Sequence, residues 1–184
     1  MFASGAALLV GSGWLARTRL TDEEVSAFRA LNEQSDAMKD AAWASMLGGT
    51  LGAVPAAAGV ALLAGRRRLA LELAIGGTAA YLLAKGVKPI VGRARPHGLL
   101  GGVRFRDEIG GNEGWISGHA AVSSSLALIS APELPPAGRV AAYAAATAIG
   151  LSRMYAGAHL PLDVIGGAGL GLIIASLMPD PRPR

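Results

Sequence analysis

Long apolar segments separated by short polar ones dominate the chain. Residues 41–65 form a run of 25 residues without a charged side chain, which exceeds the roughly 18 apolar residues that indicate a membrane-spanning helix. Arg66, Arg67 and Arg68 follow this run directly. Because a basic cluster in a short loop marks the cytoplasmic side of a membrane protein, we expect the next helix to run outward.

Five further apolar segments complete the pattern. Residues 69–91 predict a long helix that carries Lys85 and Lys88 toward its outer end, where long basic side chains can reach the membrane surface. The three C-terminal segments are shorter than the roughly 20 residues that a bilayer requires, so their helices should extend into the neighbouring polar residues. Besides 69–91, the segments are residues 2–16, 117–131, 140–152 and 164–179.

The segment 21–39 has a different pattern, that of a helix lying on a membrane surface. Thr21 is a suitable N-cap, and acidic residues 22–24 fill the first turn. Its apolar side chains fall roughly on one helical face. These are Val25, Phe28, Leu31 and Met38. We therefore predict an amphipathic helix at the outer interface.

Together these segments predict an all-α fold, a polytopic membrane helix bundle with about six transmembrane helices plus the interfacial helix. We expect one domain over residues 1–184, in which 1–40 hold the first helix and the amphipathic segment and 41–179 form the core. The composition agrees: 52% of residues are hydrophobic and 16% are charged, against about 25% charged in soluble domains. The 26 glycines favour close helix packing in lipid.

Charge and cysteine content exclude several function classes. The chain has no cysteine, which rules out disulfides, thiolate nucleophiles and cysteine-ligated zinc. Its net charge of +4 could attract nucleic acid, but aromatic residues make up only 5% of the sequence. Proteins that bind single strands rely on aromatic stacking, so we expect no nucleic-acid partner.

The first group of candidate site residues lies where the 69–91 helix ends. Lys88 precedes Arg95 and Pro96 in the spacing Lys-x6-Arg-Pro. If the chain turns after residue 91, both cations can converge on one anion. The structural alternative is that these cations only reach the membrane surface and balance the helix C-terminus.

The second group is Ser117, Gly118 and His119, at the start of an apolar helix. Backbone N–H groups at a helix N-terminus and a hydroxyl bind anions, and glycine permits close approach. A histidine can donate a proton to a departing alkoxide. The alternative is a capped helix with an incidental histidine.

The third group has the spacing Ser-Arg-x5-His-x3-Asp and comprises Ser152, Arg153, His159 and Asp163. Since His159 and Asp163 are four residues apart, we expect them on one helix face, where the carboxylate holds one ring nitrogen and leaves the other as a nucleophile. Arg153 offers a planar fork for phosphate oxygens. A purely structural His–Asp pair is the alternative.

Two other kinds of site compete for these residues. A zinc site is disfavoured because the three histidines, His97, His119 and His159, form no His-x3-His pair and lie among cations that repel a metal dication. A Ser-His-Asp hydrolase would not need several cations for a neutral ester. We therefore predict a phosphate site rather than a zinc site or an esterase site.

The three groups together resemble the signature of the type 2 phosphatidic acid phosphatase family, the membrane branch of a superfamily that includes bacterial acid phosphatases and vanadium haloperoxidases. That signature reads Lys-x6-Arg-Pro, then Pro-Ser-Gly-His, then Ser-Arg-x5-His-x3-Asp. This chain matches the signature in order and spacing. The resemblance covers roughly residues 41–178 of this chain. Ile116 stands where the family usually has proline, so we expect altered geometry at the entry to that helix.

The resemblance implies a mechanism. His159 would attack phosphorus and form a phosphohistidine, Asp163 would orient it, and His119 would protonate the leaving oxygen. The equatorial oxygens would be held by Lys88, Arg95, Ser117, Gly118 and Arg153. The cations would replace a metal ion, so the resemblance implies a site with no metal and no cofactor, and vanadate would inhibit.

We accordingly expect a multi-pass protein of the cell inner membrane, with its site at the outer, periplasmic face and a lipid phosphate as substrate. Phosphotransfer on the same site and a non-catalytic membrane scaffold are the alternatives; a haloperoxidase is disfavoured because that branch is soluble. Glycine-rich helices pack equally well within or between chains, which leaves a homo-oligomer open.

Charged residues of the long loop 92–115 are candidates for selecting the lipid head group, unless they simply form a solvated loop. They are Arg104, Arg106, Asp107, Glu108 and Glu113.

Overall fold

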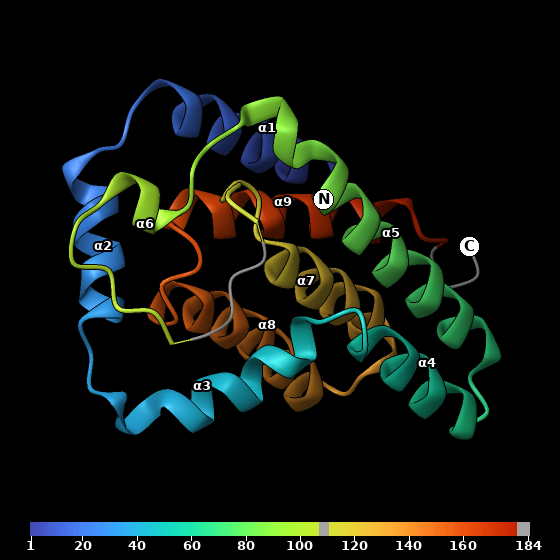
Figure 1. Ribbon diagram of the computed structural model, residues 1–184. Helices are drawn as coiled ribbons and strands as arrows, with labels where there is room; N and C mark the ends of the chain where they lie inside the picture. The colour runs from blue at the N-terminus through green and yellow to red at the C-terminus, as the bar shows by residue number, and fades with distance from the viewer. Residues whose placement is uncertain (107–110, 180–184) are drawn as a thin grey trace.

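The computed structural model describes residues 1–106 and 111–179 (Figure 1). Within these residues the chain is helical, with one isolated bridge between Ala94 and Glu113 and no β-strand. The prediction of an all-α fold is confirmed. The α-helices are α1 (Phe2–Thr18), α2 (Asp22–Asn32), α3 (Lys39–Met46), α4 (Ala53–Leu63), α5 (Arg67–Val91), α6 (Pro96–Leu99), α7 (Gly118–Ser130), α8 (Pro136–Tyr155) and α9 (Pro161–Leu177).

Helix α7 lies in the centre of the bundle, packed against α5, α8 and α9 (Figure 1). Helix α1 covers α9 from the other side, and α4 packs on α5. Small residues make these approaches close. A side chain at Gly169 of α9 would place its Cβ only 2.8 Å from the backbone nitrogen of Leu9 in α1, so glycine is required where these two helices touch.

The apolar run 41–65 is not one straight helix, contrary to the sequence prediction. It divides into α3, the 3₁₀ turn η2 (Leu47–Gly49) and α4, and the two halves are bent by 68°. Gly48, Gly49 and Gly52 weaken the helix at this point, since each costs about 1 kcal/mol relative to alanine. Packing fixes the break, because a Cβ at Gly49 would lie 2.8 Å from the Cβ of His119.

By length and composition, α5 is the one described helix that could cross a membrane alone, and the bent pair α3–α4 could supply a second span. The other described helices do not combine enough length with enough hydropathy to meet the same test. Six transmembrane helices therefore stay a prediction.

Helix α2 begins as predicted and then departs from the expectation. The Thr21 hydroxyl accepts a hydrogen bond from the backbone nitrogen of Glu24 at 3.3 Å, which confirms the N-cap. The helix ends at Asn32, however, and residues 36–38 form a separate 3₁₀ turn, η1 (Asp36–Met38). Met38 is exposed and does not share the face of the buried Phe28.

The buried face of α2 points into the protein. Phe28 packs with Met154 and Leu160 beside the loop that joins α8 to α9. Asn32 is equally buried, and its amide donates to the backbone oxygens of Arg104 at 2.8 Å and Tyr155 at 3.1 Å. These contacts make α2 a support for the functional loops.

Candidate active site

All three predicted groups meet at one cavity of about 570 Å³, a size typical of small-ligand sites. It opens at the C-terminal end of α5, beside the N-terminus of α7 and the C-terminus of α8. Six of the eight predicted site residues line it: Lys88, Arg95, Gly118, His119, Arg153 and His159. The remaining two, Ser117 and Asp163, are fully buried behind it.

Lys88 and Arg95 are fixed by backbone oxygens of neighbouring loops. The Lys88 ammonium, in the last turn of α5, donates to the backbone oxygen of Glu113 at 3.0 Å. The Arg95 guanidinium donates to the backbone oxygens of Ala158 and Gly111, both at 2.9 Å. Since Ala158 precedes His159 in the chain, Arg95 ties the first group directly to the third.

Ser117 acts as the N-cap of α7. Its hydroxyl accepts a hydrogen bond from the backbone nitrogen of Ala120 at 3.4 Å, and its own backbone nitrogen donates to the backbone oxygen of Asp163 at 2.8 Å. The Ser117 side chain does not line the cavity, whereas Gly118 and His119 do. A contact between Ser117 and phosphate therefore stays a prediction.

Ile116, which stands in place of the family's proline, is a core residue. Its side chain is fully buried, and a Cβ at Gly166 of α9 would lie 2.7 Å from its Cγ2. The peptide bond between Trp115 and Ile116 is cis.

Arg153 lies in the last turn of α8 and is buried. Its Nη1 lies 2.9 Å from the Met46 sulfur in α3. The hydroxyls of Ser152 and Ser45 are 2.8 Å apart, which connects α8 with α3 at the same level. The first half of the broken apolar segment thus supports the third group.

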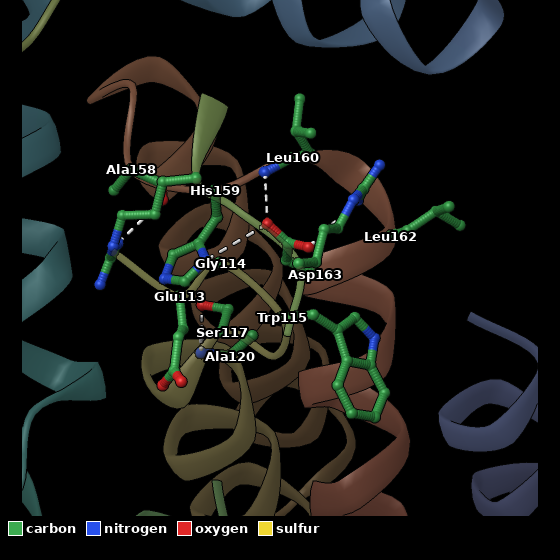
Figure 2. Close-up of polar contacts among 12 residues, drawn as sticks. Glu113, Gly114, Trp115, Ser117, Ala120, Ala158, His159, Leu160, Leu162 and Asp163 are labelled. Carbon is green, nitrogen blue, oxygen red and sulfur yellow. Dashed lines mark hydrogen bonds and ion pairs between the residues drawn. The ribbon is translucent and has the colours of Figure 1, made fainter. Parts of the chain in front are cut away.

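His159 and Asp163 do not share a helix face, contrary to the prediction. His159 lies in the loop before α9, Leu160 is the N-cap, and Asp163 is the third residue of the helix. The Asp163 carboxylate accepts a hydrogen bond from the Leu160 backbone nitrogen at 2.8 Å and lies 3.5 Å from the His159 Nδ1 (Figure 2). A capping turn therefore brings the two side chains together. At 3.5 Å the contact is long for a hydrogen bond.

A buried ion-pair network lies behind Asp163, and the sequence analysis missed it. Arg93 donates to the other Asp163 carboxylate oxygen at 3.1 Å and to both oxygens of Glu24, at 2.9 and 2.5 Å. The Leu162 backbone nitrogen also donates to Glu24, at 3.1 Å. All three charged side chains are at least 95% buried. The network therefore runs from α2 through Arg93 to the Asp163–His159 pair.

The environment of His159 favours a neutral imidazole. Burial lowers its pKa to about 4, and the charges of Lys88 and Arg153 act in the same direction, while Asp163 opposes them. Because Nδ1 faces Asp163, Nε2 is the ring nitrogen left for the cavity. A neutral ring with this orientation can act as a nucleophile at neutral pH.

Two of the loop residues proposed to select a head group have structural contacts instead. Arg106 is buried and donates to the Asp36 carboxylate at 2.6 Å and to the Tyr155 backbone oxygen at 2.7 Å. This hydrogen bond lowers the pKa of Asp36. Arg104 donates to the backbone oxygen of Glu33 at 3.2 Å. Neither arginine lines the cavity, nor does Glu113. Residues 107 and 108 lie outside the described residues.

Over residues 1–106 and 111–179, no group of three or more histidine, aspartate or glutamate side chains is arranged to hold a metal ion. The cavity instead gathers cations around two histidines, and this donor set fits a phosphate.

Comparison with known proteins agrees with this geometry. Residues 69–180, more than half of the chain, match the PAP2 superfamily. The chain belongs to the PAP2 superfamily. The resemblance inferred from the three motifs is thereby confirmed. A search among curated proteins found no match.

Two solved structures share the fold of this PAP2 protein. LpxE of Aquifex aeolicus is 23% identical, with a TM-score of 0.74 over 84% of this chain and 93% of that one. A transmembrane PAP2-type phosphatidylglycerolphosphate phosphatase of Bacillus subtilis is 22% identical, with a TM-score of 0.70 over 97% of this chain and 94% of its own.

Proposed function

We propose that this protein is an integral membrane phosphatase that hydrolyses a phosphomonoester or diphosphate of a lipid. The observation that carries the proposal is the meeting of Lys88, Arg95 and Arg153 with His119 and His159 at one cavity. Membership of the PAP2 superfamily supports it, as does the similarity to a phosphatidylglycerolphosphate phosphatase.

In the proposed reaction, the Nε2 of His159 attacks phosphorus in line with the leaving oxygen. A phosphorus–nitrogen bond forms while the phosphorus–oxygen bond to the lipid breaks, and His119 donates a proton to the departing oxygen. Water then attacks the phosphohistidine, with His119 accepting its proton. Inorganic phosphate leaves, and His159 is restored. Asp163 holds the ring throughout.

The cations supply the electrostatic part of the catalysis. Phosphoryl transfer spreads negative charge over the equatorial oxygens, so fixed donors aimed at those oxygens lower the barrier. Lys88, Arg95, Arg153 and the Gly118 amide fill this role in the proposal. They do so without a metal ion, and the phosphate analogue vanadate should inhibit by occupying the same position.

The two ends of α5 support a site at the outer membrane face. Arg66, Arg67 and Arg68 lie at its N-terminus, and Lys88 lies in its last turn. A helix of 25 residues is about 37 Å long, which is enough to cross the hydrocarbon core of about 30 Å. If the basic turn is cytoplasmic, the cavity faces outward.

Replacing the nucleophile tests the proposal. His159→Ala should abolish phosphate release from lipid phosphates in detergent micelles. His97→Ala is the matched control, because His97 contacts Phe105 and lies outside the cavity, and it should retain activity. Full activity of His159→Ala would refute the proposal. Label passing from lipid phosphate to an added alcohol, with none in inorganic phosphate, would assign transfer instead of hydrolysis.

A further inference from the structure

Residues 111–114 contact both cations of the first signature group, although none of these four residues belongs to the signature. The Lys88 ammonium donates to the backbone oxygen of Glu113 at 3.0 Å. The Arg95 Nε donates to the backbone oxygen of Gly111 at 2.9 Å. We call residues 111–114 the cation clamp, because its backbone joins the last turn of α5 to the loop that carries Arg95.

The cation clamp holds these cations from outside the cavity. Lys88 and Arg95 line the cavity, whereas residues 111–114 do not, so the clamp oxygens leave the ligand space open. A lysine ammonium has three N–H donors. Those of Lys88 contact the oxygens of Glu113 and, at 3.4 Å, Gly114. Two occupied donors fix the direction of the third, and donors fixed before the ligand arrives are what electrostatic catalysis requires.

Backbone hydrogen bonds fix the position of the cation clamp against residues 93–95. The Arg95 nitrogen donates to the Asn112 oxygen at 3.0 Å. The Gly114 nitrogen donates to the Arg93 oxygen at 2.7 Å. Because a shift of register by one residue would present different groups to each side, this pairing determines which clamp oxygens reach the two cations.

Glycine is required at both ends of the cation clamp, for different reasons. At Gly114 space is lacking, since a Cβ would lie 2.9 Å from the Ala94 oxygen and 3.1 Å from the Asp163 Oδ2 (Figure 2). At Gly111 space is open, with nothing within 4 Å of an added Cβ, but φ is +76°, in the left-handed region. The direction of the Gly111 oxygen therefore depends on backbone conformation alone.

We infer that the cation clamp is a positioning element of the phosphate site, in which Gly111 acts through Arg95. The left-handed conformation of Gly111 directs its oxygen at the Arg95 Nε, and this contact holds the guanidinium in the orientation that binds a phosphate oxygen. A residue that disfavours positive φ turns the oxygen away and weakens phosphate binding. This inference rests on the proposed phosphatase function and adds positioning residues to its site.

The phosphate analogue vanadate tests this role, since calorimetry in detergent micelles measures its affinity without a lipid substrate. Gly111→Ala should weaken vanadate binding by about tenfold, the size expected when one hydrogen bond to a charged group is lost. Gly111→Asn should bind like the wild type, because asparagine tolerates the left-handed conformation. Wild-type affinity in Gly111→Ala, or an equal loss in both variants, would overturn the inference.

Gly102→Ala is the matched control. Gly102 has φ +71° and nothing within 4 Å of an added Cβ, as Gly111 does, but it belongs neither to the cation clamp nor to the cavity lining. Both alanine variants should lower the thermal midpoint to a similar extent, and only Gly111→Ala should lose vanadate affinity. An equal loss of affinity in Gly102→Ala would show that backbone strain alone is responsible.

A double variant tests whether Gly111 acts through Arg95. In an Arg95→Gln background, the side chain that the Gly111 oxygen holds is absent, so Gly111→Ala should cause little further loss of vanadate affinity. A full additional loss in that background would contradict the assigned route.

Hydrogen exchange on the unaltered protein gives a test that does not depend on any variant folding. If a fixed clamp favours vanadate binding, bound vanadate must stabilise the clamp by the same factor. The amide hydrogens of Arg95 and Gly114, which join the clamp to residues 93–95, should therefore exchange more slowly with vanadate present. Unchanged exchange in the vanadate complex would overturn the inference. A wild-type protein that neither binds vanadate nor releases phosphate would instead overturn the proposed function.

Discussion

Asp163 accepts three hydrogen bonds besides its contact with His159. One carboxylate oxygen accepts from the Leu160 backbone nitrogen, the other accepts from Arg93, and its backbone oxygen accepts from the Ser117 nitrogen. The carboxylate therefore has little freedom to rotate. A fixed carboxylate sets which ring nitrogen of His159 faces the cavity, and such orientation is a large part of what an acid–base pair contributes.

For the single residue His159, burial leads to a direct prediction about the pH at which the ring takes up a proton. Burial disfavours the imidazolium and lowers the pKa to about 4 from an ordinary value near 6.5. The ring should therefore stay neutral as the pH falls through 6.5 and take up a proton only near 4. Histidine-selective NMR in detergent micelles, with His159→Ala for assignment, measures this titration. A midpoint near 6.5 would contradict the burial seen in the structure.

At the scale of one helix, α2 and its C-cap residue Glu33 allow a buried ion pair to be compared with an exposed one. Glu24 pairs with Arg93, and the two side chains are only 5% and 4% exposed. Glu33 instead pairs with Arg29 at the surface. Removing one partner of a buried pair costs about 3–5 kcal/mol, while surface pairs contribute less than about 1 kcal/mol. Of these two glutamates, Glu24 is therefore the one whose loss should destabilise the fold.

We predict that Glu24→Gln lowers the thermal midpoint of the purified protein and reduces phosphate release, because it weakens the support of Arg93 and Asp163. Glu33→Gln should change neither quantity. Thermal unfolding in detergent and a phosphate assay measure both effects. Equal behaviour of the two variants would show that the Glu24–Arg93 pair has no special role.

The break between α3 and α4 leads to a second prediction for a single element. A Cβ at Gly49 would lie 2.8 Å from the Cβ of His119 and 2.9 Å from its backbone oxygen. Gly49→Ala should therefore displace the N-terminus of α7, and we expect kcat/KM to fall by at least about tenfold, since small displacements of reacting groups are costly.

Gly59→Ala is the control for this change. Gly59 lies in α4, and nothing lies within 4 Å of an added Cβ. Alanine there improves helix propensity, so activity should be retained. Wild-type kcat/KM in Gly49→Ala would mean that the α3–α4 turn does not position His119.

For the molecule as a whole, the orientation of the site in the membrane can be tested by labelling. The natural chain has no cysteine, so single introduced cysteines give no background. Gly101 lies in the exposed loop on the cavity side, and Arg67 lies in the basic turn at the other end of α5. The two variants are Gly101→Cys and Arg67→Cys. An impermeant maleimide should label the first in intact cells and the second only after permeabilisation. The reverse pattern would place the cavity on the cytoplasmic side.

The sequence was sufficient to predict the six signature residues that line the cavity, but not the rest of the lining or the residues that support it. Motif spacing constrains groups that contact one small ligand, so Lys88, Arg95, Arg153 and both histidines could be recognised without coordinates. Glu24 was assigned to the first turn of a surface helix. Its spacing with Phe28 and Asn32, four residues each, was the available signal, but a search for apolar faces ignores buried polar residues whose partners are remote in sequence.

Two predictions were wrong for related reasons: that residues 41–65 form one helix, and that His159 and Asp163 share a helix face. A run of 25 uncharged residues satisfies the length criterion for a membrane helix, yet close packing of Gly49 on His119 determines its course. A four-residue spacing satisfies the criterion for a shared helix face, yet the capping turn at Leu160 determines the contact of His159 with Asp163. In both cases tertiary contacts override local periodicity.

The supports of the cavity also limit how far the protein can be shortened. Residues 69–180 match the superfamily and contain every signature side chain. Glu24, Gly49 and the Ser12 hydroxyl, which accepts a 3.3 Å hydrogen bond from Trp115, all precede them. An excised 69–180 fragment would keep the whole motif and lose the scaffold that shapes it, so a minimal enzyme for engineering has to start at α1.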